Sequence, residues 1–297
     1  MKVALTGATG FVGSHILTEL RDHGHEVLAL VRDEGQADAV AGRGASATVI
    51  DLYDRPGVVS LLGDVDGAIH TASPGDATSA DLDSAVVDAA IEAFAGTGKP
   101  YIQISGLWVY GNNTSITEES PFNAPPLVAW KEPIERRVLG ASGMRGVVIV
   151  SATAYGDGGG GIPGLVLGSP RDEDGNLIML GTGRQHWAEV HVADLADLFR
   201  RALEEESASG RYVVSNGAHA TLAEITEAAS VAVGAPGAVP GSDAEARARL
   251  GDYFAEVLLL DQGTEAAKAR AELGWSPSRP GLVDEFLEGS YRKVTAG

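Results

Sequence analysis

The chain has 297 residues, of which 41 are acidic and 22 basic, and its formal net charge is −19. A charge of this sign and size argues against binding to nucleic acid and to anionic membranes. There is no cysteine, which excludes disulfides, thiolate catalysis and cysteine metal sites, and we expect no metal centre. No apolar run reaches the eighteen or so residues that span a bilayer, and no signal peptide precedes the first predicted strand. We therefore expect a soluble cytoplasmic protein.

The first 31 residues predict a βαβ unit. A short apolar run, 3–5, leads into a glycine-containing loop, and an amphipathic segment, 14–23, follows it. A second apolar run covers 27–31. This order is typical of strand, tight turn, helix and strand.

The loop between the first strand and the helix carries glycines at three spaced positions. Gly7 lets the backbone turn at the end of the strand, and Gly10 lets the chain approach a pyrophosphate closely. Gly13 lets the helix pack near the strand. The phosphates would bind the free N–H groups at the helix start, where the helix dipole favours negative charge. The loop predicts dinucleotide binding.

The stretch Thr6-Gly-Ala-Thr-Gly-Phe-Val-Gly13 resembles the extended short-chain dehydrogenase/reductases, the NAD(P)-dependent epimerase/dehydratase group. Further marks of this group recur along almost the whole chain. The resemblance implies that most of this loop contacts the cofactor. The residues expected to do so are Gly7, Thr9, Gly10, Phe11, Val12 and Gly13.

The second strand, Glu26 to Val31, bears on the choice between NADP and NAD. In related proteins that bind NAD, an acidic residue at this strand end holds the adenosine ribose. Here Val31 stands at that position and Arg32 follows it. A guanidinium can bind a 2′-phosphate through two parallel hydrogen bonds, so we favour NADP over NAD. The alternative is a solvated Arg32 with Asp33 as the ribose ligand.

Two further strand ends resemble cofactor-binding segments of the family. The run 47–50 leads into a pair that resembles the residues beside the adenine, and strand 67–73 ends in small residues where the backbone passes the cofactor. We interpret His70 as a packed strand residue, because nothing nearby in sequence supplies the carboxylate that would orient a base. The expected cofactor-binding residues are Asp51, Leu52, Thr71, Ala72 and Ser73.

The middle of the chain predicts the rest of the dinucleotide domain. The segment 80–94 has apolar positions at helical spacing, and 101–105 reads as the fifth strand. After it, 105–111 resembles the strand-five signature of the family. We expect a helix at 129–139 and a sixth strand at 146–150, which completes the dinucleotide-binding domain, 1–150.

After residue 150 the composition shifts towards a smaller domain. The glycine-rich stretch 155–161 is interpreted either as a mobile lid or as a surface loop without function. The segment 189–199 resembles the family's return to the main sheet, with Asp194 capping or orienting its helix, and Thr221 is expected to cap a helix at 222–233. We expect 184–215 to return to the dinucleotide-binding domain, while 151–183 and 216–297 form the small substrate domain.

The resemblance implies a redox site made of a Ser or Thr, a Tyr and a Lys, with the Tyr four places before the Lys. Lys131 matches the lysine and would bind the nicotinamide ribose, and Glu135 supports the register. Leu127 stands where the tyrosine is expected, and Gly106 where the hydroxyl residue is expected, with Ser105 next to it. Past strand six, Ser151 replaces a proline of the family. The cofactor end therefore matches the family and the proton-transfer end does not.

Other residues near the predicted cleft can supply chemistry. With Lys131, the catalytic candidates are Ser105, Tyr110 and Tyr155, and water is a further proton source. Three tryptophans flanking the cleft fit an apolar, even aromatic, substrate. Arg184 is the main candidate for gripping a pyrophosphate, and the scarcity of arginines weakens a nucleotide-sugar interpretation. The three tryptophans are Trp108, Trp130 and Trp187.

The expected fold is α/β, a doubly wound parallel sheet (Rossmann fold) with a smaller C-terminal substrate-binding domain. The first hypothesis for function is an NADPH-dependent oxidoreductase acting on a small, mostly apolar carbonyl or enone. Alternatives are a non-redox cyclase, lyase or isomerase in the same pocket, and a catalytically silent NADP-binding regulator. The expected partner is a small-molecule substrate, and a homodimer is left open.

Overall fold

Seven parallel strands form the central sheet, in the order β10-β6-β5-β4-β1-β2-β3. The structure is a computed structural model that describes residues 1–292. The strand order reverses beside β1, and in doubly wound sheets ligands bind in the crevice at such a point. The expected fold is confirmed. The strands are β1 (Lys2–Thr6), β2 (Glu26–Val31), β3 (Ser46–Val49), β4 (Gly67–His70), β5 (Pro100–Gly106), β6 (Arg145–Ser151) and β10 (Gly210–Val214).

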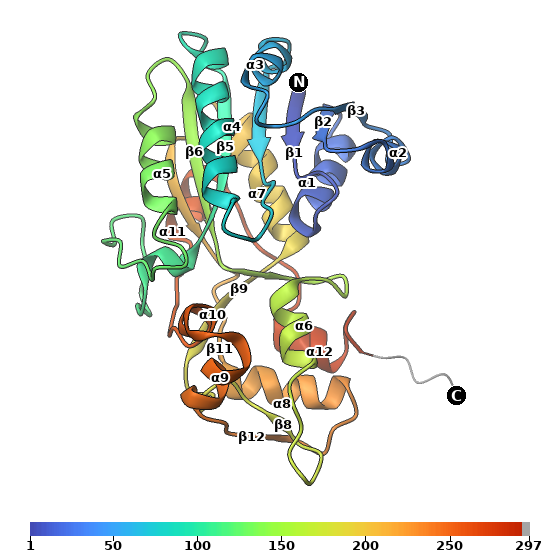
Figure 1. The fold of residues 1–297 in the computed structure, drawn as a ribbon, viewed down its shortest axis with the longest axis vertical. Helices are drawn as coiled ribbons and strands as arrows, with labels where there is room; N and C mark the ends of the chain where they lie inside the picture. The colour runs from blue at the N-terminus through green and yellow to red at the C-terminus, as the bar shows by residue number, and fades with distance from the viewer. Residues whose placement is uncertain (293–297) are drawn as a thin grey trace.

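Helices cover both faces of this sheet (Figure 1). On one face α1 (Phe11–Asp22) packs against α7 (Val192–Glu204), and on the other α3 (Arg55–Gly63) and α5 (Lys131–Gly140) pack against α4 (Ser79–Phe94). Two shorter helices, α2 (Glu34–Ala41) and α11 (Ala267–Leu273), and a 3₁₀ turn, η1 (Leu107–Tyr110), complete this part.

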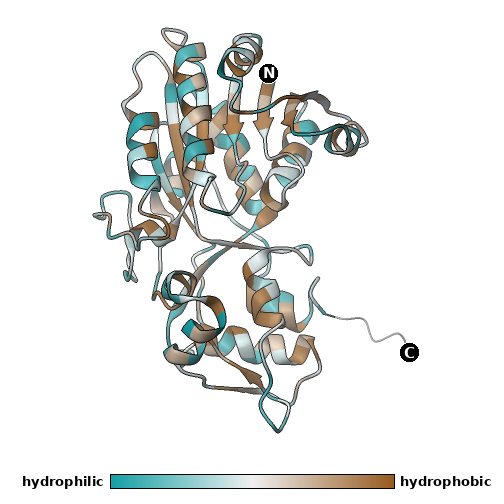
Figure 2. Ribbon diagram, in the orientation of Figure 1, coloured by the Kyte–Doolittle hydropathy of each residue, from teal (hydrophilic) through white to brown (hydrophobic). Residues whose placement is uncertain are grey.

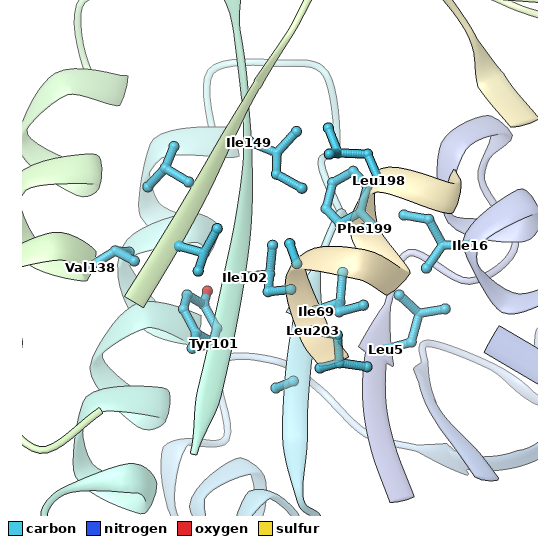
Figure 3. Close-up of a cluster of buried hydrophobic side chains, with 14 of the residues drawn as sticks. Leu5, Ile16, Ile69, Tyr101, Ile102, Val138, Ile149, Leu198, Phe199 and Leu203 are labelled. Carbon is cyan, nitrogen blue, oxygen red and sulfur yellow. The ribbon is translucent and has the colours of Figure 1, made fainter. Parts of the chain in front are cut away.

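Figure 3 shows the apolar side chains that join the helices to the strands. Phe199 and Leu203 of α7 lie against Ile102 of β5 on one side of the sheet. Tyr101, the neighbour of Ile102 on β5, points to the other side, towards Val138 of α5. Both faces of the strands are therefore buried, as is usual for parallel sheets, and the strands are largely hydrophobic in Figure 2.

A smaller part of the chain lies at the carboxyl ends of the central strands (Figure 1). It contains a three-stranded sheet in the order β11-β9-β7 and a two-stranded sheet of β12 and β8. Five helices surround these strands. The elements are β7 (Thr153–Tyr155), α6 (Gly161–Leu167), β8 (Leu177–Ile178), β9 (His186–His191), β11 (His219–Thr221), α8 (Leu222–Ala232), β12 (Ala238–Val239), α9 (Asp243–Leu250), α10 (Asp252–Leu258) and α12 (Leu282–Leu287).

The buried apolar side chains fall into two clusters, one around the central sheet and one in the smaller part. Ala269, Leu273 and Trp275 belong to the cluster of the central sheet, although we expected 216–297 to lie in the small domain. The Trp275 indole donates to the Asp194 backbone oxygen at 2.8 Å. The C-terminal region thus crosses back to the main sheet before α12 rejoins the smaller part.

Two predicted helix caps have different outcomes. Thr221 caps α8 and forms a reciprocal capping box with Glu224, as predicted. Asp194 does not cap α7, because the cap is His191, whose Nδ1 accepts from the Ala193 N–H. The Asp194 carboxylate instead accepts from the backbone N–H groups of residues 278 and 279. Its role is to hold the C-terminal turn. Within residues 1–292, no helix is both long and apolar enough to cross a membrane.

Candidate functional site

The glycine-rich loop between β1 and α1 is shaped by close backbone approaches. Gly7 has a φ of +74°, and a Cβ on it would lie 2.7 Å from the Ala72 nitrogen. A Cβ on Gly13 would lie 2.1 Å from the Gly7 oxygen. Gly10 is the N-cap residue of α1 and offers no side chain to cap the helix. The first N–H groups of the helix are therefore left for a ligand, which fits a pyrophosphate.

A cleft of about 850 Å³ lies beside this loop, at the carboxyl ends of β1 to β4. It extends to the end of β2 and to the segment after β3, where an adenosine would lie in a doubly wound fold. Gln36 and Tyr53 also line it and were not foreseen. Of the expected cofactor-binding residues, it brings together Gly7, Thr9, Gly10, Arg32, Asp51, Leu52, Thr71, Ala72 and Ser73.

The end of β2 presents a cation to this cleft. The Arg32 side chain is exposed, and its backbone N–H donates to the Gln36 side chain at 3.1 Å. Asp33 caps α2, where its carboxylate accepts from the Gln36 N–H at 2.9 Å. Because Asp33 is engaged by its own helix, Arg32 is the charged group best placed for the substituent on the ribose.

A second cleft, of about 290 Å³, adjoins the first at the start of α1. Gly10 lines the first cleft, and its neighbours Phe11 and Val12 line the second. The ends of β5 and β6 form its floor, and Trp108 and Trp187 are among the other residues that line it. Among the residues described, no Asp, Glu, His, Lys, Arg or Tyr lines it. Its remaining lining residues are Ile104, Ser105, Gly106, Leu107, Ser151, Ala152, Thr153, Ala154, Gly160, Gly161, Ile162, Ala188, Val257, Leu258, Leu260 and Gln262.

The hydroxyls on the floor of the second cleft are already engaged. Ser105 donates to the Glu135 carboxylate at 2.6 Å, and Ser151 donates to the Ala152 backbone oxygen at 2.8 Å. Glu135 is only 1% exposed, and its other oxygen accepts from the Arg211 guanidinium at 2.7 Å. Sequence reasoning assigned Glu135 no contact of its own, because Arg211 is far away in the chain.

Lys131 lines neither cleft. Its ammonium lies 4.3 Å from the centre of the Trp130 ring. Burial lowers the pKa of the Lys131 ammonium, and the nearby Asp83 and Glu135 carboxylates raise it in part. Leu82, beside Asp83, lines the first cleft, and Ser105, the partner of Glu135, lines the second.

Leu127 does not occupy the place of the missing tyrosine. We expected the helix to begin at residue 129 and Leu127 to stand where the family has its tyrosine. Instead α5 begins at Lys131, and a turn covers 126–130. Leu127 is 38% exposed and lines neither cleft. Leu127 and Lys131 are therefore not one turn apart on a single helix, because Leu127 lies in the turn that precedes α5.

The two candidate tyrosines lie outside both clefts. Tyr110 is buried and stacks on Phe122, with ring centres 5.4 Å apart, and its hydroxyl has no hydrogen-bond partner among the described residues. The Tyr155 hydroxyl donates to the Pro280 oxygen at 2.8 Å in the core of the smaller part. Burial raises the pKa of both phenols further above the ordinary value. We therefore no longer propose either tyrosine as the proton donor.

The glycine-rich stretch is held in place on two sides. On one side, the Tyr291 hydroxyl accepts from the Gly156 N–H at 2.7 Å, and the Ser290 hydroxyl accepts from the Gly158 N–H at 2.8 Å. On the other side, Asp157 lies 2.8 Å from the imidazole of His15 on α1. The stretch has defined contacts, and Gly160 and Gly161 form part of the wall of the second cleft.

The structure places three other residues in surroundings that differ from those expected from the sequence. Trp130 lies under Lys131 rather than in the second cleft, and Arg184 is exposed and lines neither cleft. His70 is packed, as expected, but a carboxylate does orient it. Its Nε2 lies 3.1 Å from Asp83, thirteen residues further along the chain. Helix α4 brings Asp83 back over the strand, which short-range sequence reasoning could not show.

Comparisons with known proteins agree with this geometry. The profile of the NAD dependent epimerase/dehydratase family matches residues 3–215. The chain is 28% identical to uncharacterized protein C2A9.02 of Schizosaccharomyces pombe, over 98% of this chain and 100% of that protein. It is 27% identical to a 3-diazoavenalumate denitrifying reductase of Streptomyces sp, over 96% of this chain and 98% of that one.

A solved structure shares the fold over nearly the whole length. The human epimerase family protein SDR39U1 (isoform 2), whose structure was solved with NADPH, superposes with a TM-score of 0.75. The superposition covers 98% of this chain and 99% of that chain, at 22% sequence identity. The likeness therefore extends through both the central sheet and the smaller part.

Proposed function

Because the chain belongs to the NAD dependent epimerase/dehydratase family, we propose that it is an NADPH-dependent oxidoreductase acting on a small, mostly apolar carbonyl or enone. The observation that carries the proposal is the second cleft. It adjoins the cofactor cleft at the start of α1, includes two tryptophans among its lining residues and has no titratable side chain among the described residues that line it. Such a cleft suits a flat apolar molecule better than a sugar phosphate.

The preference for NADPH rests on Arg32. When bound, the nicotinamide cofactor supplies a hydride. The Arg32 guanidinium would bind the 2′-phosphate, and the open N–H groups at the start of α1 would bind the pyrophosphate. Lys131 would hold the nicotinamide ribose. The NADPH in the structure of the human neighbour supports this choice, and the family description, which names NAD, makes the comparison of the two cofactors essential.

The lack of an acidic side chain among the described residues that line the second cleft narrows the class of substrate. Hydride addition to a simple ketone puts a full negative charge on one oxygen, which needs a proton donor close by. Hydride addition to a conjugated enone spreads the charge, and water can protonate the product later. Ser105 is hydrogen bonded to Glu135, so its proton is not directed at a substrate carbonyl. Within the proposed class, we therefore favour the enone.

A second candidate substrate is an aromatic diazonium compound. The name of the Streptomyces relative describes a reductase that removes nitrogen from a diazo compound. Reduction of an aryl diazonium takes up one hydride, forms a C–H bond, breaks the C–N bond and releases N₂, so no proton is needed. Indole faces such as those of Trp108 and Trp187 attract cations, and no cationic side chain among the described residues lines the cleft.

Turnover with a substrate panel tests the proposal. We would follow NADPH consumption and product mass with simple ketones, conjugated enones and arenediazonium salts. Trp108→Ala should lower kcat/KM at least about tenfold by removing an apolar wall. Tyr253→Ala, at an exposed position outside both clefts, should leave it unchanged. Consumption with enones but not ketones is the expected result, and consumption with diazonium salts alone would favour the second candidate.

The remaining alternatives are distinguishable in the same assay. Substrate conversion without net NADPH consumption would indicate a cyclase, lyase or isomerase. Tight NADP(H) binding with no conversion across the panel would indicate a regulator, and the oxidoreductase proposal would then fail. The cytoplasmic location stays a prediction, which cell fractionation can test, and the question of a homodimer stays open to sedimentation equilibrium.

A further inference from the structure

A chain of buried polar side chains runs beneath the cofactor cleft, on the side of the sheet covered by α4. The Thr6 hydroxyl lies 2.6 Å from Nδ1 of His70, and Nε2 of His70 lies 3.1 Å from one oxygen of Asp83. The other Asp83 oxygen accepts from the Gln103 amide at 3.0 Å. The Gln103 amide oxygen in turn accepts from the Tyr101 hydroxyl at 2.7 Å. All five residues are less than 5% exposed.

The chemistry of these groups gives the chain a direction. A carboxylate only accepts hydrogen bonds, so Nε2 of His70 carries the hydrogen and donates it to Asp83. In an imidazole that carries one hydrogen, Nδ1 then accepts, and the Thr6 hydroxyl donates to it. With its hydrogen directed at His70, the Thr6 oxygen is free to accept from the backbone N–H groups of Thr71 and Ala72, each at 3.3 Å.

Thr6 therefore clamps two loops that line the cofactor cleft. It precedes Gly7, and its backbone oxygen also accepts from the Thr71 hydroxyl at 2.8 Å. The two loops approach each other closely, since a Cβ on Gly7 would lie 2.7 Å from the Ala72 nitrogen. A change in the direction of the Thr6 hydroxyl would loosen the loops at their closest point.

We propose that Asp83 is a positioning residue of the cofactor site, holding the glycine-rich loop against the loop after β4 through His70 and Thr6. The carboxylate is the fixed acceptor that determines which nitrogen of His70 carries the hydrogen. It lies on α4, the helix that packs against the α5 helix of Lys131. Asp83 thus lies between the loop that would bind the pyrophosphate and the helix whose Lys131 would hold the nicotinamide ribose.

The charge of Asp83 also acts on Lys131. Two carboxylates face this ammonium, Asp83 from α4 and Glu135 from its own helix, and both raise the pKa that burial lowers. Glu135 is paired with Arg211, whereas the side chains within hydrogen-bonding distance of Asp83 are His70 and Gln103. This step rests on the proposed function only in assuming that Lys131 contacts the cofactor.

Asp83→Asn keeps the shape of the side chain and removes its charge. We expect its NADPH dissociation constant to rise about tenfold, the size of one lost buried hydrogen bond. Asp81→Asn removes an equal charge from the exposed face of the same helix and should leave the constant within about twofold. Isothermal titration across a pH series would measure both variants.

A direct titration of Lys131 separates positioning from general loss of stability. The chain has five lysines, so ¹³C-dimethylated lysine signals can be assigned, with Lys131→Arg identifying the signal of Lys131. In the protein without cofactor, Asp83→Asn should make Lys131 lose its proton at a lower pH, while Asp81→Asn should not. An unchanged Lys131 titration together with unchanged NADPH affinity would overturn the proposal.

A second pair of variants covers the case in which Asp83→Asn does not fold. Thr6→Val removes the hydroxyl and keeps the branched shape, and Thr6→Ser keeps the hydroxyl. Thr6→Val should weaken NADPH binding about tenfold, Thr6→Ser should restore it, and neither should alter the Lys131 titration. Equal affinities for the two Thr6 variants would contradict the clamp. If the wild type binds no dinucleotide, the proposed function fails, and the Lys131 titration still tests Asp83.

Discussion

The hydroxyl of Ser105 and the carboxylate of Glu135 are joined by a 2.6 Å hydrogen bond at the floor of the second cleft. Glu135 is buried and also accepts from Arg211 at 2.7 Å. Through these two hydrogen bonds, Glu135 of α5 joins β5 to β10 below the second cleft. The serine that sequence analysis offered as a proton donor is thus part of the structural support of the floor.

Ser105→Ala should therefore affect stability more than chemistry. It leaves one oxygen of the buried Glu135 without a donor, which should lower the free energy of unfolding by about 1–3 kcal/mol. Removing a true proton donor would lower the rate by a factor of about 10²–10⁴. For Ser105→Ala we expect less than about a tenfold loss in the rate of single-turnover hydride transfer. Urea unfolding and rapid-mixing measurements would check the two effects separately. A rate loss of the larger size with unchanged stability would return Ser105 to the role of donor.

Arg32→Ala should weaken NADPH binding and leave NADH binding unchanged. Loss of a charge-assisted pair with the 2′-phosphate should weaken the free energy of NADPH binding by about 1.5–3 kcal/mol. The neighbouring Asp33 is engaged as the cap of α2 and does not replace this contact. Arg184→Ala is the matched control, since Arg184 is exposed and lines neither cleft. Titration of both cofactors against the three proteins would show the difference. Equal affinity of the wild type for NADPH and NADH would contradict the assignment.

Glu189 should make the stability of the protein depend on pH. Its carboxyl is 1% exposed, one oxygen has no hydrogen-bond partner among the described residues, and burial raises its pKa to about 7. The folded state therefore holds the proton more tightly than the unfolded state, whose pKa is near the ordinary 4.5. This contribution is fully present below pH 4.5, is lost as pH rises towards 7, and amounts to on the order of 3 kcal/mol.

Glu189→Gln should remove that dependence, because the amide resembles the neutral acid. We expect the variant to be more stable than the wild type at pH 8 and about equal to it at pH 4.5. Glu26→Gln, at an exposed position at the start of β2, serves as the control and should follow the wild type. Denaturant unfolding at a series of pH values is the measurement. Parallel stability curves for the wild type and Glu189→Gln would rule out the raised pKa.

Tyr110→Phe and Tyr155→Phe should have opposite effects on stability. The Tyr110 hydroxyl is buried without a partner among the described residues, so its removal should raise the free energy of unfolding by up to about 1 kcal/mol. The Tyr155 hydroxyl donates to Pro280 and accepts from Asn216 at 3.2 Å, so its removal should cost about 1–2 kcal/mol. Thermal and urea unfolding would compare them. A large loss of hydride transfer in either variant would show that our placement of the phenols outside the chemistry is wrong.

Much of the cofactor half was predictable from sequence because it depends on neighbours in the chain. The spacing of Gly7 and Gly13 reflects a turn and a helix start within a few residues, and the order of apolar runs predicts parallel strands. The strand ends at Arg32, Asp51 and Thr71 then meet at one edge of the sheet, because parallel strands share their carboxyl ends. Local backbone geometry and the handedness of βαβ units are sufficient for this inference.

The arrangement of residues around the second cleft depends on contacts between residues far apart in the chain. Leu127 lies in a turn rather than on the helix, because α5 begins two residues later than its apolar pattern suggests. Tyr155 lies in the core of the smaller part, where β7 pairs with β9, although its neighbours Thr153 and Ala154 on β7 line the second cleft. Asp83 reaches His70, and Glu135 reaches Arg211, only after α4 and α5 pack on the sheet. Sequence periodicity records which face of an element is buried, and it carries no information on which distant polar group will be buried against it.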